Sequence, residues 1–244
     1  MRIIDAHVHL GNNPKTKYYT LKELRRDLGE ASAQGAVVFA FPEDMYRTID
    51  SEESRVRANE YVLEASKSSR DIYPFYFVWN DYLIPENLDE YLGIKWHRHA
   101  DEPRYDYEDP RCGRILEKIR DLGLPVLLEE EFEPTLRFIE RNPELRVVIP
   151  HMGRMNGGYE LMDAFFNDPN VYFDTSVASP EAISRVIDNV GVERVIFGSD
   201  VSGTRLPFYN FPKVELEKIL KLNLDDESLR LVLAENIESL IKRR

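Results

Sequence analysis

The sequence predicts a single (β/α)8 barrel, also called a TIM barrel, and three observations support that fold class. Eight short runs rich in β-branched and aromatic residues alternate with longer segments of helical period. The chain has 244 residues, which is about the size of one such barrel. No segment rich in proline, glycine or serine divides the chain, so we expect one domain over residues 1–244.

The predicted strands are runs of four to eight residues bounded by turn signals. They span residues 3–10, 36–41, 72–79, 93–97, 125–129, 146–151, 171–175 and 194–199. Helical segments are expected between and after them, at residues 21–34, 53–70, 86–91, 110–122, 133–141, 158–166, 180–189, 213–220 and 226–241. A doubly wound open sheet is the alternative. It needs a glycine-rich phosphate turn after the first strand, and Gly11-Asn12-Asn13-Pro14 is not one.

Composition excludes several classes of partner. With a formal net charge of −12, the chain lacks the basic surface that binds nucleic acids or anionic membranes. No apolar run approaches the roughly 20 residues of a membrane span. Cys112 is the only cysteine, so nothing indicates an oxidising compartment. We therefore expect a cytoplasmic protein whose partner is a small-molecule substrate, with a homodimer as the expected assembly.

The first predicted strand carries an unusual polar row. Residues two apart in a strand point to the same face, so Asp5, His7 and His9 lie opposite an apolar row. In a parallel barrel, the carboxyl ends of the strands form the active-site mouth. All five histidines, together with two acidic residues, fall at or near such ends: His7, His9, His97, His99, His151, Glu129 and Asp200.

Imidazoles and carboxylates that converge from several strands suit a divalent ion such as Zn²⁺. This ion takes nitrogen and oxygen ligands and can keep an open position for water. The histidine pair of the first strand supplies two ligands from one element. Asp5 lies deeper on the same face, where it is expected either to orient a histidine or to join a buried ion pair.

Several segments resemble the amidohydrolase superfamily, most closely the branch that contains aminocarboxymuconate-semialdehyde decarboxylase. The segments are DAHVH, IPHMG, FGSD and the terminal ENIESLI, and GIKWH and LGLPVLLEE fall in family order. The resemblance implies a metal-dependent barrel in which His7 and His9 are metal ligands. It implies that Asp200 is a ligand that also handles a proton of the attacking water. For His151 it implies a catalytic acid or base, or a ligand of a second metal.

One position departs from the family pattern. At the end of the fifth strand the family usually has a metal-binding histidine, and this sequence has Glu129. Carboxylate oxygen and imidazole nitrogen reach Zn²⁺ at about the same distance, so we expect Glu129 to join the metal site. We expect one divalent ion, zinc first, with manganese as the alternative because a carboxylate favours harder metals.

Four more residues are candidates for substrate binding. Lys95 and His97 end the fourth predicted strand, and Arg154 and Arg205 follow the sixth and eighth. An arginine at the mouth can clamp an anionic substrate, and plain surface placement is the alternative for both arginines. For Lys95, carbamylation as a bridging ligand and an ordinary ion pair stay open.

These features favour a metal-dependent hydrolase that cleaves a small C–O or C–N bonded substrate with a metal-activated water. Asp200 is expected to accept the proton of the water. His151 is expected to polarise the scissile carbonyl or to protonate the leaving group. Two alternatives remain: a non-oxidative decarboxylase of a small unsaturated or aromatic acid, and a barrel that has lost activity and binds a ligand.

Overall fold

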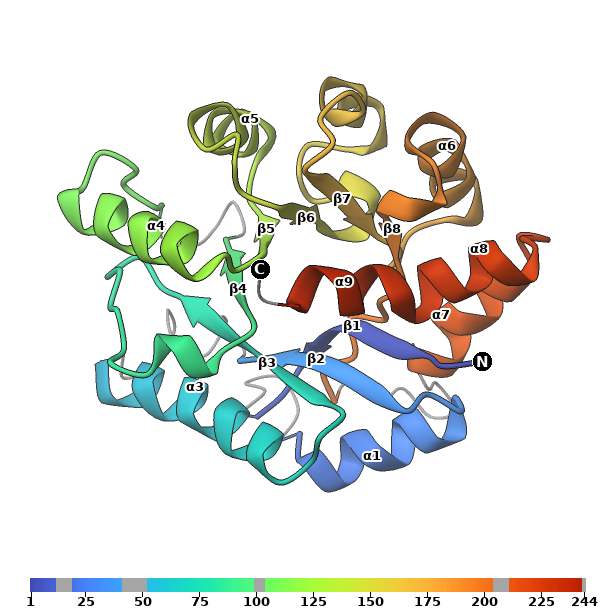
Figure 1. Cartoon of the computed structure of the whole chain (residues 1–244), viewed down its shortest axis with the longest axis horizontal. Helices are drawn as coiled ribbons and strands as arrows, with labels where there is room; N and C mark the ends of the chain where they lie inside the picture. Colours follow the sequence, from blue (N-terminus) through green and yellow to red (C-terminus); the bar gives the residue numbers. More distant parts are fainter. Residues whose placement is uncertain (12–18, 41–51, 99–103, 204–210, 243–244) are drawn as a thin grey trace.

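Eight parallel strands, β1 to β8, lie in sequence order in one curved sheet in the computed structural model (Figure 1). The structure describes residues 1–11, 19–40, 52–98, 104–203 and 211–242. Backbone hydrogen bonds connect the last strand region to the first. The amide of Ala6 donates to the carbonyl oxygen of Phe197, and that of His9 to Val201, both at 2.9 Å. The sheet therefore forms a nearly closed barrel, and the predicted (β/α)8 fold is confirmed.

The strands are short, and almost all of their residues are buried, as expected when helices cover a parallel sheet. Each of the eight predicted runs coincides with one strand. The eighth is much shorter than predicted, because it keeps regular pairing over two residues only. The strands are Ile4–His9 (β1), Gly35–Phe39 (β2), Ile72–Val78 (β3), Gly93–His97 (β4), Val126–Glu129 (β5), Val147–Ile149 (β6), Val171–Asp174 (β7) and Val195–Ile196 (β8).

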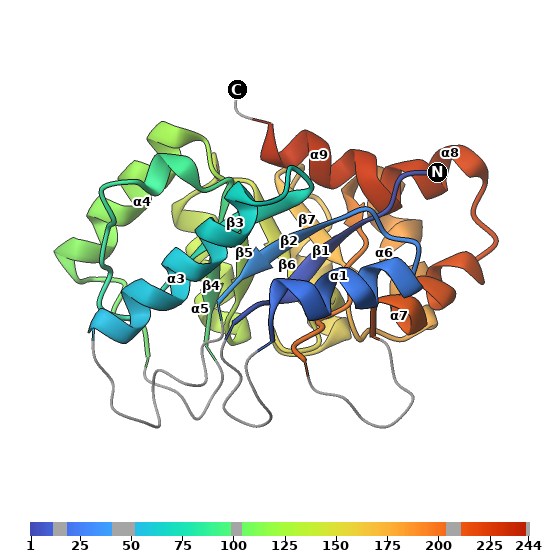
Figure 2. The same cartoon turned by 90° about the horizontal axis from the view of Figure 1, so that it is seen from below.

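Helices surround the barrel, as Figures 1 and 2 show. The α-helices are Leu21–Glu30 (α1), Glu52–Lys67 (α3), Pro110–Leu122 (α4), Phe132–Arg141 (α5), Pro180–Val190 (α6), Phe211–Leu220 (α7), Asp226–Arg230 (α8) and Asn236–Ile241 (α9). The 3-10 helices are Leu88–Glu90 (η1), Pro150–Gly153 (η2), Tyr159–Phe165 (η3) and Val192–Arg194 (η4). Within the described ranges, no helix is both long and apolar enough to cross a membrane.

Three predicted helices differ in detail from the observed ones. Residues 86–91 keep only the short 3-10 helix η1. Residues 158–166 form a 3-10 helix instead of an α-helix. Residues 226–241 do not form one continuous α-helix, since a π-helical turn at Leu231–Glu235 (η5) separates α8 from α9. The amide of Phe197 donates to the carbonyl oxygen of Val232 in this turn at 2.9 Å, so β8 and the terminal helices are fixed together.

Local sequence signals explain where the helices begin and end. Thr20 and Glu23 form a reciprocal capping box at the start of α1. Asp109 caps α4, and Pro110 occupies its first turn, where a missing amide proton costs nothing. Gly123 ends α4 in the left-handed conformation, with φ of 63°. The chain can therefore turn back into β5 within a few residues.

Apolar and polar layers divide the barrel interior. The amino-terminal half holds one buried apolar cluster, to which β1, β2, β3, β5, β6 and β8 contribute together with the last helix. Ile237 and Leu240 of α9 belong to this cluster, and α9 lies across that end of the barrel in Figure 2. Near the carboxyl ends of the strands the buried residues change to His7, Lys95 and Glu129. The candidate site lies in this polar layer.

Candidate metal centre

Two imidazoles and one carboxylate meet at the carboxyl end of the barrel. His7 and His9 alternate along β1 and are buried, and Asp200 lies just beyond β8. The Oδ1 atom of Asp200 is 3.3 Å from Nε2 of His9 and 3.5 Å from Nε2 of His7. Their ligand atoms lie within 4.8 Å of one another. The three residues can therefore hold a metal ion, and that they do so stays a prediction.

Gly198 lets the β8 segment approach β1 closely. A Cβ atom at this position would lie 2.8 Å from the Cβ of His7, well inside ordinary contact distance. Any side chain here would separate the two segments and would displace Asp200, whose amide donates to the carbonyl oxygen of His7 at 2.9 Å. The glycine in the FGSD segment is thus required by a close backbone approach.

Hydrogen bonds behind the rings determine which imidazole nitrogen faces Asp200. Nδ1 of His7 lies 2.7 Å from Oδ2 of Asp174, and Nδ1 of His9 lies 3.2 Å from the carbonyl oxygen of Ala40. An ionised carboxylate and a carbonyl can only accept, so each Nδ1 carries the proton and donates it. The Nε2 lone pairs of both rings are then available to a metal ion near Asp200.

The protonation states also suit metal binding. Burial, reinforced by the positive charge of Lys95, lowers the pKa of His7 to about 4, so the ring is neutral at pH 7. Burial alone would raise the pKa of Asp200, but the adjacent imidazoles of His9, His7 and His151 lower it below its usual value. Neutral imidazole and ionised carboxylate are the forms that coordinate a divalent ion. The donor set therefore fits an ion such as zinc.

Access to this group is one-sided. The Asp200 side chain is 31% exposed, whereas the side chains of His7 and His9 are 0% and 7% exposed. Asp200 also adopts φ of 61°, in the left-handed region that residues other than glycine use sparingly. Such strained conformations cluster at functional sites. Solvent and substrate thus reach the group from the Asp200 side.

Asp174, at the end of β7, organises the floor of the site. Its Oδ1 atom accepts hydrogen bonds from the amides of His151 and Ser176, both at 3.0 Å, and from the Ser176 hydroxyl. Its Oδ2 atom accepts the bond from His7 described above. His7, His151 and Asp174 form a second group that could hold a metal ion. One buried carboxylate therefore positions both histidines.

His151 lies on a 3-10 turn, η2, directly after β6 and not on the strand itself. Its φ is 55° and that of Met152 is 52°, so two consecutive residues are left-handed. Its Nδ1 atom is 3.1 Å from the carbonyl oxygen of Ser176, and because a carbonyl only accepts, Nδ1 is protonated. Its Nε2 atom faces Glu129, 3.4 Å from Oε2.

Glu129 controls the charge of His151. Burial would lower the pKa of His151, but the charge of Glu129 and a hydrogen bond to it raise that pKa to about 9. Burial would raise the pKa of Glu129, yet His97, Lys95 and His151 hold it well below its usual range. In the metal-free protein, an imidazolium at position 151 therefore faces an ionised carboxylate at neutral pH.

Lys95 is fully buried within the same cluster. Its Nζ atom donates to Oε2 of Glu129 at 3.0 Å and lies 3.4 Å from Nε2 of His7. It also lies 4.9 Å from the centre of the Phe39 ring. The ion pair that the sequence left open for Lys95 is thus present, and its role in substrate binding stays a prediction.

Glu129 faces the barrel interior from β5, opposite His97 in the β4–β5 register. Besides Lys95 and His151, its Oε2 atom contacts Nε2 of His97 at 3.4 Å. The groups of metal-binding residues found in the described part of the chain do not include Glu129 or His97. Metal ligation by Glu129 and substrate contact by His97 therefore stay predictions.

The two arginine candidates receive less support from the structure. Arg154 follows η2, and its side chain is exposed. It forms no ion pair with any residue in the described ranges. Arg205 lies outside the described residues, as does His99.

Three supporting residues, Asp174, Ser176 and Ser199, were not predicted. Asp174 and Ser176 end a strand on the same side of the barrel as Asp200, and this positional rule would have found them. Ser199 donates to Asp5 through its amide at 2.9 Å and its hydroxyl at 2.5 Å. Asp5 therefore ties β1 to the segment before Asp200. Of the two roles expected for Asp5, it neither contacts an imidazole ring nor forms an ion pair with a described residue; its other hydrogen bond comes from the backbone amide of His7 at 3.2 Å.

An eight-stranded parallel barrel with imidazoles and carboxylates at its carboxyl end defines a class of enzyme folds whose active sites lie at that end. Within this class, the sequence profile described as "Amidohydrolase" matches residues 4–243. The chain belongs to the amidohydrolase family. A search of curated proteins found no match.

Solved structures of the same fold cover nearly the whole chain. A Pseudomonas putida protein provisionally described as a 2-pyrone-4,6-dicarboxylic acid hydrolase is 17% identical, with TM-score 0.78 and coverage of 98% of this chain and 97% of that chain. A 5-carboxyvanillate decarboxylase from Sphingomonas paucimobilis is 13% identical, with TM-score 0.71 and coverage of 100% and 99%. A 2,6-dihydroxybenzoate decarboxylase from Rhizobium is 13% identical, with TM-score 0.73 and coverage of 99% of both chains. Both hydrolases and decarboxylases share this fold.

Proposed function

We propose that this protein is a metal-dependent hydrolase of a small substrate with a scissile C–O or C–N bond. The observation that carries the proposal is the convergence of His7 Nε2 and His9 Nε2 on Oδ1 of Asp200. His7, His9 and Asp200 would hold one divalent ion, zinc first and manganese as the alternative. Glu129 is a further ligand in this proposal, directly or through water. Such an ion would supply Lewis acidity, which lowers the pKa of water from 15.7 towards about 7.

Asp200 accepts the proton of the attacking water. Its low pKa keeps it ionised at neutral pH, and its side chain is the most solvent-exposed of the three proposed ligands. A general base must reach the proton that it removes, and the Asp200 carboxylate is 31% exposed at the carboxyl end of the barrel. His7 and His9 are held rigidly behind it by Asp174 and Ala40.

His151 donates a proton to the leaving group or polarises the scissile carbonyl. The Nδ1 proton of His151 is donated to the carbonyl oxygen of Ser176, so Nε2 is the atom that can donate a proton to the substrate. In the metal-free protein the pKa of His151 is raised to about 9, so Nε2 carries a proton at neutral pH. A general acid and a general base of opposite protonation state are thus available on two sides of one site.

Decarboxylation of an unsaturated or aromatic acid is the second candidate, and the buried Lys95 favours it. That reaction needs a cation for the substrate carboxylate and a proton donor for the resulting carbanion. Lys95 is a cation in the site, but its ammonium already pairs with Glu129 at 3.0 Å and is fully buried. A substrate carboxylate would have to displace Glu129. In hydrolysis only Nε2 of His151 must leave Glu129, across a longer contact of 3.4 Å, so we favour hydrolysis.

The third reading, a barrel that has lost activity, draws on Glu129 in place of the family histidine. The fixed tautomers of His7 and His9 argue against this reading, because a site that has lost its activity does not need Nε2 lone pairs held towards Asp200. The localisation that fits these proposals is the cytoplasm, with a small molecule as the partner and a homodimer as the assembly.

A substrate screen separates these readings. Purified protein is stripped with a chelator, reloaded with zinc or manganese, and assayed on lactones, amides and small unsaturated or aromatic acids. We expect ester or amide cleavage that the Asp200→Asn variant loses by at least about 100-fold, the usual scale of a general base. Carbon dioxide release without hydrolysis would overturn the proposal in favour of decarboxylation. No turnover in either loaded form would favour the binding-only reading.

A further inference from the structure

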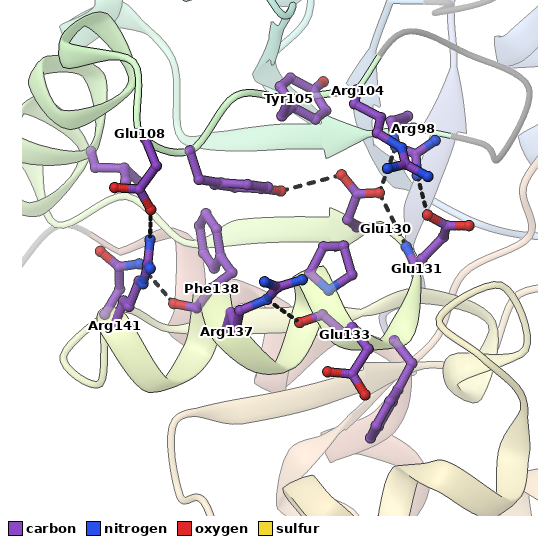
Figure 3. Close-up of a pocket in the computed structure, with 15 residues that line it drawn as sticks. Arg98, Arg104, Tyr105, Glu108, Glu130, Glu131, Glu133, Arg137, Phe138 and Arg141 are labelled. Carbon is purple, nitrogen blue, oxygen red and sulfur yellow. Dashed lines mark hydrogen bonds and ion pairs between the residues drawn. The ribbon is translucent and has the colours of Figure 1, made fainter.

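A pocket of about 640 Å³ lies outside the barrel, between α4 and α5 (Figure 3). Its inner end contacts the segments that follow β4 and β5, at Arg98 and Glu130. Pockets of roughly 300 to 1,000 Å³ bind drug-sized molecules. None of the residues that line it belongs to the groups that could hold a metal ion. It is therefore a separate candidate site, which the proposed function does not use.

The floor of the pocket is aromatic. The rings of Tyr107 and Phe138 lie 6.2 Å apart at 74°, and Leu116 adds an apolar side chain from α4. Behind Tyr107, the ring of Trp96 lies nearly parallel, at 6.1 Å and 11°. Phe138 is only 2% exposed, so the half-buried ring of Tyr107 is the aromatic surface against which a planar ring can lie.

Fixed ion pairs form the two ends of the pocket. At the inner end, Arg98 donates from Nε to Oε1 of Glu130 at 2.7 Å and also contacts Glu131. The side chains of Arg98 and Glu130 are 2% and 1% exposed, so this pair is part of the protein interior. At the outer end, Arg141 pairs with Glu108 at 2.6 Å. Arg98 and Arg141 thus offset two of the four glutamate charges that line the pocket.

Two guanidinium groups keep their charge available. Among the residues that the structure describes, neither Arg104 nor Arg137 forms an ion pair, and Arg137 donates only to the backbone oxygen of Glu133, at 3.3 Å. In Figure 3, Arg137 extends along the pocket, whereas the carboxylate of Glu133 is directed away from it. Helix α5 also begins here, at Phe132, without a side-chain cap. Arg104 and Arg137 are therefore the two lining cations that a bound anion can engage without breaking an ion pair.

We propose that this pocket binds a small planar organic anion, namely an aromatic carboxylate. Its ring lies against Tyr107, and Arg137 holds its carboxylate by charge-assisted hydrogen bonds. Arg104 adds positive charge at the inner end. A neutral ring of the same shape fills the same floor but gains nothing from the guanidinium groups, so the site discriminates by charge.

Trp96 provides a direct readout because it stacks on Tyr107. The chain has two tryptophans, and the Trp79→Phe variant leaves Trp96 as the single reporter. Titration of this variant with benzoate is expected to change its fluorescence saturably. The neutral analogue benzamide is expected to bind at least about tenfold more weakly, on the usual scale of a charged hydrogen bond. Calorimetry of the wild-type chain repeats the comparison without the Trp79→Phe change.

Variants locate the bound benzoate. We expect Arg137→Met to weaken binding about tenfold or more and Arg104→Met to weaken it less. The matched control is Arg185→Met, which removes an exposed arginine from a remote surface pair with Asp163 and should change nothing. The His7→Ala/His9→Ala variant should keep benzoate affinity, because the pocket does not need the metal centre.

Two results would overturn this assignment. One is the absence of any saturable signal up to about 50 mM benzoate, well beyond ordinary weak affinities. The other is binding that His7→Ala/His9→Ala abolishes and Arg137→Met leaves unchanged, since that pattern places the anion at the metal centre. Neither result bears on hydrolysis, which the substrate screen tests separately.

Discussion

Oδ2 of Asp174 accepts a 2.7 Å hydrogen bond from Nδ1 of His7, and both side chains are fully buried. This contact fixes the tautomer of His7 and turns its Nε2 lone pair towards Asp200. The same carboxylate, through Oδ1, accepts the backbone amide of His151. One residue at the end of β7 therefore sets the position of a proposed ligand and of the proposed acid.

Replacing Asp174 with Asn should weaken metal binding. The amide can present its NH2 group to His7 Nδ1 and so favour the wrong tautomer. Loss of such a supporting partner usually costs about 10- to 100-fold in metal affinity. The measurement is competitive zinc titration against a chromogenic chelator. Asp163→Asn, an exposed carboxylate on η3, is the control that should match wild type. Equal affinity of Asp174→Asn and wild type would contradict this role.

Replacing Lys95 with Met should destabilise the metal-free protein by about 3–5 kcal/mol, because it leaves Glu129 buried without its nearest cation. The double variant Lys95→Met/Glu129→Gln should recover much of that loss, since no isolated charge remains. Urea unfolding with chelator present measures the free energies of unfolding of all four proteins in the cycle. Strictly additive losses would show that the 3.0 Å pair is not energetically coupled.

The stability of the metal-free protein should fall as pH rises from about 7 to 10. Glu129 raises the pKa of His151 from 6.5 to about 9, a shift that corresponds to at most about 3 kcal/mol. A raised folded-state pKa gives stability that is complete below the unfolded value and is lost as pH passes the folded value. The measurement is the free energy of unfolding as a function of pH across this range. The His151→Gln variant should lose most of this pH dependence, and an unchanged slope in that variant would refute the raised pKa of His151 as its cause.

The Glu129→His variant should bind zinc more tightly if Glu129 joins the metal site. Imidazole is the ligand that the family resemblance implies at this position, and it favours zinc over harder ions. Glu129→Gln is the companion variant, because it keeps the shape and removes the charge. We expect zinc affinity to rise in the first and to fall in the second. Unchanged affinity in both would confine Glu129 to its contacts with Lys95, His97 and His151.

The sequence predicted those features that depend on strand periodicity and order. Alternation along β1 placed His7 and His9 on one face, and parallel order brought Asp200 to the same end of the barrel. The register of β4 against β5 sets Glu129 opposite His97, and that register cannot be read from either strand alone. The contacts of Glu129 with Lys95 and His151 were therefore not predicted.

Other features could not be predicted from the sequence because they depend on backbone conformation. The short strand β6 ends at Ile149, and His151 reaches the site through two left-handed residues that no propensity indicates. A single aspartate after a short apolar run is common, so the sequence alone did not distinguish Asp174. Its role follows from the four hydrogen-bond donors that surround it in the structure. The pocket between α4 and α5 is also lined by the segment before α4, and sequence periodicity does not show that these three segments lie together.

The central claim is that His7, His9 and Asp200 bind one divalent ion. Anomalous diffraction at the zinc edge, from crystals of protein reloaded with zinc, tests it most directly. We expect one strong peak about 2.0–2.2 Å from Nε2 of His7, Nε2 of His9 and a carboxylate oxygen of Asp200. The absence of a peak at these three atoms in fully reloaded protein would contradict it, as would a peak held by other residues alone.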